Sequence, residues 1–212
     1  MTPEEVYREI DRDIESVEAW WMHRRDEQRR VALKSSRFPI EVWFDYLSPR
    51  HNRYMVLNII LGRKYNTNGL SSVFAVQKME RGHAIYFTKF PRQKLASKIV
   101  VMPHVFDRYA ERCGIDKTGL EIVKHFVTHN YQGKDVRGDK FSARSVRYQG
   151  RDNLCLCTHD GVMMGEDVGG IFVARTFITY DMAAGVQRDE FNDSRLMMLT
   201  QEEYLKDCKQ YY

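Results

Sequence analysis

The chain has 212 residues, of which 43% are hydrophobic and 29% are charged, so it is long enough to bury a core and is neither disordered nor fibrous in composition. The net charge of +4 is too small to indicate a polyanionic partner by itself. No run approaches the roughly 18 apolar residues that span a bilayer, and the start Met-Thr-Pro-Glu-Glu lacks the pattern of a secretion signal, so we expect a cytoplasmic protein with no membrane partner.

The first predicted element is one long helix that ends near Ser35. Thr2 supplies a hydroxyl cap, Pro3 suits the first helical position, and acidic residues follow near the positive end of the helix dipole. Apolar residues then recur at helical spacing and predict one buried face. These residues are Val6, Ile10, Ile14 and Val17.

Four strands are predicted after residue 39, where the hydrophobic period changes. Runs rich in β-branched and aromatic residues are bounded by turn residues there. The connections contain Ser-Pro-Arg, Asn-Thr-Asn-Gly and Arg-Gly, which suit hairpins. We therefore expect an antiparallel meander made of residues 40–47, 54–61, 71–78 and 83–90.

Two helices are predicted after a short apolar run at 99–102. Pro103 suits the first turn of the first helix, and Gly114 suits its C-terminal stop. The second helix is expected from about residue 118 to residue 131, with an apolar side for burial. Residues 133–140 are expected to form a loop.

The last part is predicted to form a second antiparallel sheet and a helix. The strand runs are 141–149, 153–159, 162–166 and 171–181, and the spacing of Thr200 and Glu203 fits a capping box. The fold class is therefore α+β. We expect a long N-terminal helix and an antiparallel β-meander in residues 1–92, a helix-helix-antiparallel sheet module in 93–188 and a C-terminal helix in 189–212, as separate domains or as one compact unit.

The helix that starts at residue 103 is the first place to look for chemistry. At about 100° per residue, His104, Arg108 and Arg112 share one stripe, and apolar residues fill the opposite side. A titratable imidazole beside two guanidinium groups suits phosphate binding and proton transfer. The alternative is a solvated face with ion pairs at three- and four-residue spacing. The acidic residues for such pairs are Asp107 and Glu111.

This arrangement resembles the nuclease superfamily that includes barnase, EndoU, colicin ribonucleases and RelE toxins. The resemblance rests on His-x3-Arg-x3-Arg on a helix, a second helix, and an antiparallel sheet that includes Arg-Thr-Phe-Ile-Thr-Tyr at 175–180. It is closest to the small phage- and toxin-related members, whose helix opens with His-Ala-x-x-Arg-x-x-x-Arg. Here Val105 replaces the small residue, and the resemblance covers about residues 99–181.

The resemblance implies metal-independent RNA cleavage without a cofactor, in which a ribose 2′-hydroxyl attacks the neighbouring phosphate. That step needs one group to take the hydroxyl proton, another to protonate the leaving oxygen, and cations for the charge on phosphate. It casts His104 as the acid or base and makes Arg108 and Arg112 phosphate clamps. Further contacts are implied for the last strand, at Arg175, Thr179 and Tyr180.

A basic segment at 134–151 is a second candidate surface. It holds six basic residues against two acidic ones and interleaves cations with aromatic side chains, as single-stranded RNA binding requires. The alternative is a solvated loop and strand. The candidate nucleic-acid-binding residues are Arg137, Lys140, Arg144, Arg147, Tyr148 and Arg151.

A metal site is a weaker alternative for the second helix. Glu121, His125 and His129 are spaced by four and share a helical face. Phe126 follows His125, so the His-Glu-x-x-His motif of metalloproteases is incomplete. Partly exposed surface histidines are the simpler explanation of the pattern.

The aromatic and cysteine residues have structural explanations. The aromatic residues are most simply core, with a dimer or partner surface as the alternative; they are Trp20, Trp21, Trp43, Phe44 and Tyr46. The cysteines fit reduced, mostly buried thiols better than a disulfide framework; they are Cys113, Cys155, Cys157 and Cys208.

Together these patterns predict an RNA-directed protein of toxin or mobile-element type, with metal-independent endoribonuclease activity as the leading hypothesis. RNA is the expected partner. The alternative is a non-catalytic module of the same fold that binds nucleic acid, a protein partner or a second copy of the chain. The alternative predicts salt-dependent binding without cleavage.

Overall fold

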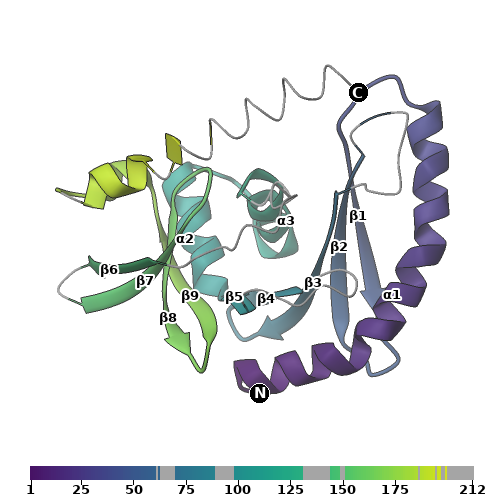
Figure 1. Ribbon diagram of the computed structural model, residues 1–212, viewed down its shortest axis with the longest axis horizontal. Helices are drawn as coiled ribbons and strands as arrows, with labels where there is room; N and C mark the ends of the chain where they lie inside the picture. Colours follow the sequence, from purple (N-terminus) through teal and green to yellow (C-terminus); the bar gives the residue numbers. More distant parts are fainter. Residues whose placement is uncertain are drawn as a thin grey trace. The chain divides into compact units, whose positions relative to one another are not determined.

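The computed structural model describes residues 1–60, 62, 70–88, 98–130, 144–148, 151–185, 187–193, 195–196 and 199. The side chains of residues 25, 70, 144–148 and 151–153 lie outside that description. The predicted α+β class is confirmed, because long helices and antiparallel strands both occur (Figure 1). Contacts divide the chain into two compact units, Met1–Lys78 with Ala84–Val100, and Met79–His83 with Val101–Tyr212. The predicted boundary at residue 92 lies outside the described residues.

The first unit begins with the long helix α1 (Pro3–Lys34), as predicted. Its start is fixed by a complete capping box, because the Thr2 hydroxyl accepts a hydrogen bond from the Glu5 backbone N–H and the Glu5 carboxylate accepts one from the Thr2 N–H. Ser35 ends the helix with extended backbone angles. Among the described residues, no helix is long and apolar enough to cross a membrane.

Five strands follow in the order β1-β2-β3-β4-β5. Strands β1 and β2 pair antiparallel, and so do β2 and β3. The predicted meander is therefore confirmed for these strands, with boundaries within two residues of the expected ones. The strands are β1 (Ile40–Leu47), β2 (Arg53–Ile60), β3 (Leu70–Met79), β4 (Gly82–Thr88) and β5 (Lys98–Val101).

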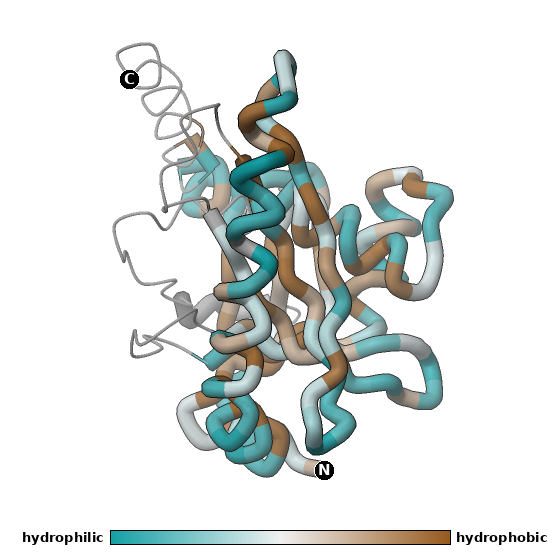
Figure 2. The backbone as a smooth tube through the Cα atoms, turned by 90° about the vertical axis from the view of Figure 1, so that its right-hand side faces the viewer, coloured by the Kyte–Doolittle hydropathy of each residue, from teal (hydrophilic) through white to brown (hydrophobic). Residues whose placement is uncertain are grey.

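Helix α1 packs on the strands of its own unit through an apolar stripe. Figure 2 shows mainly hydrophilic colour along the helix and long hydrophobic stretches on the strands. Trp21 is buried, and its ring meets Phe44 edge to face with 5.7 Å between centroids. Trp20 stacks on Tyr46 at 4.8 Å. The core interpretation is therefore confirmed for Trp21, while the other four predicted residues, Trp20, Trp43, Phe44 and Tyr46, are half-buried.

The second unit contains α2 (Pro103–Cys113) and α3 (Gly119–Asn130). Gly114 ends α2 in the left-handed conformation, with φ 64°, which glycine adopts without strain. The apolar sides of the two helices meet in an aromatic cluster in which rings pack edge to face at 5.0–6.1 Å. The cluster consists of Phe106, Tyr109, Phe126 and Phe177.

The sheet of the second unit has the strand order β9-β8-β7-β6, and each neighbouring pair is antiparallel. Helix α2 packs against β9. The strands are β6 (Arg144–Tyr148), β7 (Arg151–Cys157), β8 (Val162–Val168) and β9 (Ile171–Ile178). The helix-helix-sheet order predicted for this part is therefore present.

Two details of the C-terminal part differ from prediction. The last strand ends at Ile178 instead of residue 181, because the chain turns there into a 3₁₀ helix, η1 (Tyr180–Met182). The C-terminal segment, which was predicted to be helical over 189–212, is already helical at residues 187–193. The helix start predicted at Thr200 lies outside the described residues.

Candidate functional site

The first two residues of the predicted stripe, His104 and Arg108, lie on the outer face of α2. Arg108 donates from Nε to the Nε2 atom of His104 at 3.2 Å and from a terminal nitrogen to the Glu111 carboxylate at 2.5 Å. Both bonds join residues on consecutive turns of one helix. The geometry therefore matches the ion-paired alternative for this face, and its acid, Glu111, occupies one of the guanidinium donors.

Arg112, the third residue of the stripe, is placed differently. Its guanidinium reaches across to β9 and donates to the backbone carbonyl oxygen of Phe177. That bond ties the end of α2 to the end of the strand, and it uses one of the five N–H groups of the side chain. Within the described part of the chain, Arg112 therefore has donors left for a ligand and a fixed position from which to offer them.

The residues predicted on the last strand do not form one group. Arg175 is an exposed bulge residue of β9, and it donates to the Glu166 carboxylate of β8 at 2.7 and 3.0 Å. Thr179 and Tyr180 lie beyond the strand, so their placement on it was wrong. Thr179 is the N-cap residue of η1, while Tyr180 is buried and donates from its hydroxyl to the Thr158 carbonyl oxygen.

The predicted nucleic-acid-binding residues fall largely outside the description. Arg137 and Lys140 are not described, and only the backbone of the other four is. In that backbone Arg144 pairs with Cys155, Arg147 with Asp152, and Tyr148 with Arg151 across the β6–β7 hairpin. Their part in RNA binding stays a prediction.

An open depression of about 550 Å³ brings Arg112, Thr179 and Tyr180 together. It lies in the second unit, where the ends of α2 and β9 meet η1. The remaining lining residues, which were not predicted together, are Cys113, Ile115, His125, Asp160, Asp181 and Arg195. His104, Arg108 and Arg175 do not line it. The depression therefore separates the six predicted catalytic residues into two groups of three.

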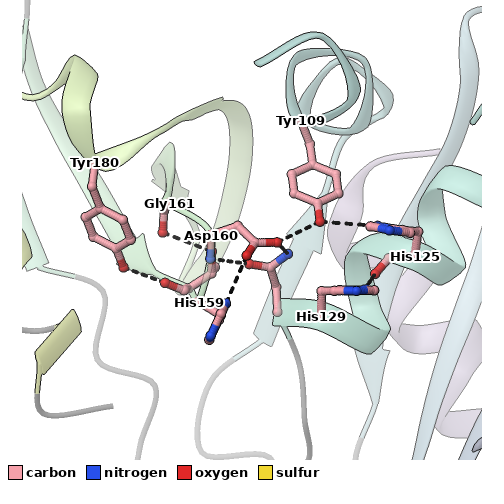
Figure 3. A network of polar contacts seen from close by, with 9 residues as sticks. Tyr109, His125, His129, His159, Asp160, Gly161 and Tyr180 are labelled. Carbon is pink, nitrogen blue, oxygen red and sulfur yellow. Dashed lines mark hydrogen bonds and ion pairs between the residues drawn. The ribbon is translucent and has the colours of Figure 1, made fainter. Parts of the chain in front are cut away.

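Asp160 is the centre of a hydrogen-bond network at one side of this depression (Figure 3). Its Oδ2 atom accepts from the Tyr109 hydroxyl at 2.7 Å and from the Asn130 amide at 3.1 Å, and its Oδ1 atom lies 2.9 Å from Nδ1 of His159. Burial alone would raise the pKa of Asp160, but the hydrogen bonds from His159, Tyr109 and Asn130 together hold it below its ordinary value. Asp160 is therefore ionised at neutral pH.

The turn that carries Asp160 packs closely against the end of β9 and against α3. Thr158 and Gly161 close it, since both the backbone N–H and the hydroxyl of Thr158 donate to the Gly161 carbonyl oxygen. A Cβ atom on Gly161 would lie 2.2 Å from the Ile178 carbonyl oxygen, so only glycine fits there. The Asp160 N–H donates to the Asn130 side chain at 2.9 Å, which joins the turn to α3.

Two histidines of α3 lie beside this network. His125 has its Nδ1 atom 3.3 Å from the Tyr109 hydroxyl oxygen, and its ring stacks on that of His129 at 4.0 Å (Figure 3). Burial, with smaller effects of His129 and Lys117, lowers the pKa of His125 below its ordinary value. His125 is therefore a neutral imidazole at pH 7.

The metal site considered for Glu121, His125 and His129 does not form. His129 uses Nδ1 to donate to the backbone carbonyl oxygen of His125 at 3.0 Å. In the described part of the chain, no group of three or more His, Cys, Asp or Glu side chains is arranged to hold a metal ion.

Within the described residues, no cysteine forms a disulfide bond. Cys155 is buried, and Cys113 and Cys157 are half-buried, while Cys208 lies outside the description. Burial raises the pKa of Cys113 to about 11, with further contributions from Asp160 and Asp181. Cys113 therefore lines the depression as a neutral thiol and is a poor nucleophile at neutral pH.

Comparison with known proteins gave no match: no family model, no curated protein and no solved structure matches this chain. The resemblance to the nuclease superfamily stays a prediction from the motif and the order of elements. The candidate site therefore rests on its own geometry. Three residues at or beside it were not predicted from the sequence, namely Asp160, Tyr109 and Arg195.

Proposed function

We propose that the second unit is a metal-independent endoribonuclease that binds a phosphate of RNA in the depression beside Arg112. The observation that carries the proposal is the convergence of two arginines, a neutral imidazole and a threonine side chain on one open depression. A nuclease that works through a 2′-hydroxyl needs these groups, namely cations for the phosphate and a group that accepts a proton.

The two arginines offer different kinds of contact. Arg112 is held by the Phe177 carbonyl oxygen, so its planar donors are fixed before a ligand binds. Arg195 is exposed, and its guanidinium carbon lies 5.0 Å from the centre of the Tyr180 ring. The fixed guanidinium of Arg112 and the more accessible one of Arg195 together suit binding of a single phosphate group of single-stranded RNA.

The side chains that line the depression carry balanced charges, so a ligand would be held by individual hydrogen bonds and ion pairs and not by a net positive charge. Two aspartates, Asp160 and Asp181, balance the two arginines. The hydrogen bond with Thr179 holds the pKa of Asp181 below its ordinary value, so this acid is charged at neutral pH. This balance is the specific observation that favours the alternative function, a non-catalytic module that binds RNA or a protein partner.

The test is incubation of the purified full chain with single-stranded RNA in excess EDTA. We expect cleavage that leaves a 2′,3′-cyclic phosphate, and no cleavage of DNA with the same base sequence because DNA lacks the 2′-hydroxyl. Arg195→Gln removes a charge-assisted contact and should lower kcat/KM by about 10- to 100-fold. Arg29→Gln, an exposed residue of α1, is the charge-matched control and should leave the rate unchanged.

The outcomes separate the alternatives. Absence of RNA cleavage by the wild-type chain, with salt-dependent RNA binding intact, would establish the non-catalytic alternative. Equal rates for Arg195→Gln and Arg29→Gln would contradict phosphate binding in the depression. Loss of cleavage in His104→Ala, with Arg195→Gln unaffected, would move the chemistry to the outer face of α2, where the sequence hypothesis places it.

A further inference from the structure

A continuous chain of hydrogen bonds links Asp160 to His125, both of which line the depression. The carboxylate accepts the proton of the Tyr109 hydroxyl at 2.7 Å, and the same hydroxyl oxygen lies 3.3 Å from His125 Nδ1 (Figure 3). Tyr109 has no exposed surface, so water does not compete for its single proton. The chain passes through three elements that are far apart in sequence, namely α2, α3 and the β7–β8 turn.

This chain determines which nitrogen of His125 carries the proton. A tyrosine hydroxyl has one proton, and here it is donated to an ionised carboxylate. The hydroxyl oxygen is therefore left as an acceptor toward His125, so Nδ1 is the protonated nitrogen. In a neutral ring the other nitrogen, Nε2, then holds an unshared electron pair. Within the described residues, the hydrogen bonds of His125 involve only Nδ1 and the backbone.

The surroundings of His125 keep its ring neutral. The titratable groups that face it are His129 on its own helix, Lys117 before that helix, and Asp160 on the turn. Arg112, Cys113, Asp181 and Arg195 share the depression with it. His129 and Lys117 oppose protonation and Asp160 favours it, while burial is the largest influence and lowers the pKa.

We propose that His125 is the general base of this site, with Tyr109 and Asp160 as positioning residues that set its tautomer. The proposal rests on the proposed nuclease function. Nε2 takes the proton of the ribose 2′-hydroxyl as the 2′-oxygen forms its bond to phosphorus and the bond from phosphorus to the 5′-oxygen breaks. The leaving 5′-oxygen takes a proton from water, and the hydroxide formed takes the proton from the His125 imidazolium, which restores the neutral ring.

The same logic operates in the serine protease triad, where a carboxylate fixes the tautomer of a catalytic histidine. Here a buried tyrosine lies between carboxylate and imidazole. A neutral base with a pKa below the ordinary histidine value stays active at lower pH than an unshifted histidine. We therefore expect the cleavage rate to fall in acid with a midpoint below pH 6.5, which is the ordinary pKa of histidine.

The experiment measures RNA cleavage in EDTA by His125→Ala, Tyr109→Phe and the wild-type chain, together with RNA affinity. His125→Ala should lower kcat by about 10²- to 10⁴-fold with the RNA Kd unchanged. Tyr109→Phe should lower kcat by about 5- to 10-fold and displace the acid limb, since the ring loses the acceptor that fixes its tautomer. His23→Ala, an exposed histidine of α1, is the control and should match the wild type.

Nitrogen-15 NMR of the imidazole supplies a readout that does not depend on activity. The wild-type chain should show His125 as the Nδ1–H tautomer, and Tyr109→Phe should change the tautomer population. Finding the Nε2–H form in the wild type would overturn the assignment. His125→Gln repeats the rate measurement if His125→Ala does not fold.

The experiment distinguishes failure of the nuclease proposal from failure of the assignment of His125 as the base. A wild-type chain that does not cleave RNA contradicts the nuclease function and the base together. A wild-type chain that cleaves while His125→Ala cleaves equally well contradicts only the base. Loss of RNA binding in parallel with cleavage in His125→Ala would also overturn the assignment, because it would make His125 a binding residue.

Discussion

The two units each contain an aspartate with nearly the same set of partners. In the first unit, Oδ2 of Asp13 accepts from the Asn52 amide at 2.8 Å and from the Tyr54 hydroxyl at 3.0 Å, and Oδ1 lies 3.5 Å from Nε of Arg50. In the second unit, Oδ2 of Asp160 accepts from an asparagine and a tyrosine, and Oδ1 faces His159. Each network therefore joins a helix to a strand hairpin or its turn.

The networks differ in what lies beyond the tyrosine. Asp13 is 2% exposed, and the Tyr54 ring beside it packs against Tyr46, so that network ends in core. Asp160 is 24% exposed, and Tyr109 continues to His125 at the depression. We infer that the same polar motif stabilises the fold where the carboxylate and the tyrosine are both buried, and that it becomes a candidate site where the tyrosine contacts a residue of the depression.

The largest effect expected from this comparison is on stability, at Asp13. Asp13→Ala leaves the amide of Asn52 and the buried hydroxyl of Tyr54 without their acceptor and should lower the free energy of unfolding by about 2–4 kcal/mol. Asp160→Ala should cost less, because the Asp160 side chain is 24% exposed whereas that of Asp13 is 2% exposed. Urea denaturation of both variants measures the difference.

The control for this measurement is Asp45→Ala, whose carboxylate forms an exposed ion pair with Arg53 at 2.8 Å. Such pairs contribute about 0–1 kcal/mol. An Asp13→Ala variant no less stable than Asp45→Ala would show that the Asp13 network does not stabilise the fold, and the comparison between the units would then fail.

The next effect concerns the turn that holds Asp160. Gly161→Ala places a Cβ atom 2.2 Å from the Ile178 carbonyl oxygen and 2.5 Å from the Phe177 ring, so the turn must move. We expect a loss of about 1–3 kcal/mol in the free energy of unfolding and a change in the NMR signals of His125. Gly62→Ala is the control, since a Cβ atom there meets nothing within 4 Å. Unchanged His125 signals in a destabilised Gly161→Ala would mean that the turn does not position the histidine.

Most of the fold could be predicted because its determinants are local. The capping residues Thr2 and Glu5 mark the start of α1, and Pro103 and Gly114 mark both ends of α2. The end of β9 could not be placed, since β-branched and aromatic residues continue through Thr179 and Tyr180. Thr179 and Tyr180 leave the strand because the Tyr180 hydroxyl donates to the carbonyl oxygen of Thr158, which lies 22 residues earlier in the sequence.

The candidate site was harder to predict, because its contacts are distant in sequence. Asp160 precedes a glycine and was explained as a turn residue, while its partners Asn130 and Tyr109 lie 30 and 51 residues away. His125 was considered as a metal ligand or as a surface histidine, because helical spacing shows which residues share a face and not what faces them. Arg112 was a candidate because of its position on the stripe, but its hydrogen bond to β9 could not be predicted from the helix alone.

The smallest expected effect is the response of the Asp160 network to acid. Because the folded-state pKa of Asp160 lies below its ordinary value of 3.8, the folded chain binds fewer protons there than the unfolded chain, and the ionised form adds stability. That stability is fully present above pH 3.8 and is lost as the pH falls through the folded-state pKa. Asp160→Asn does not titrate, so its stability deficit relative to the wild type should be largest near neutral pH and should shrink in acid. Urea denaturation between pH 2 and 7 measures the deficit, and carbon-13 NMR of the Asp160 carboxyl follows the titration directly. A deficit that stays constant over this range would show that the three hydrogen bonds do not favour the ionised form, and the tautomer assigned to His125 would lose its basis.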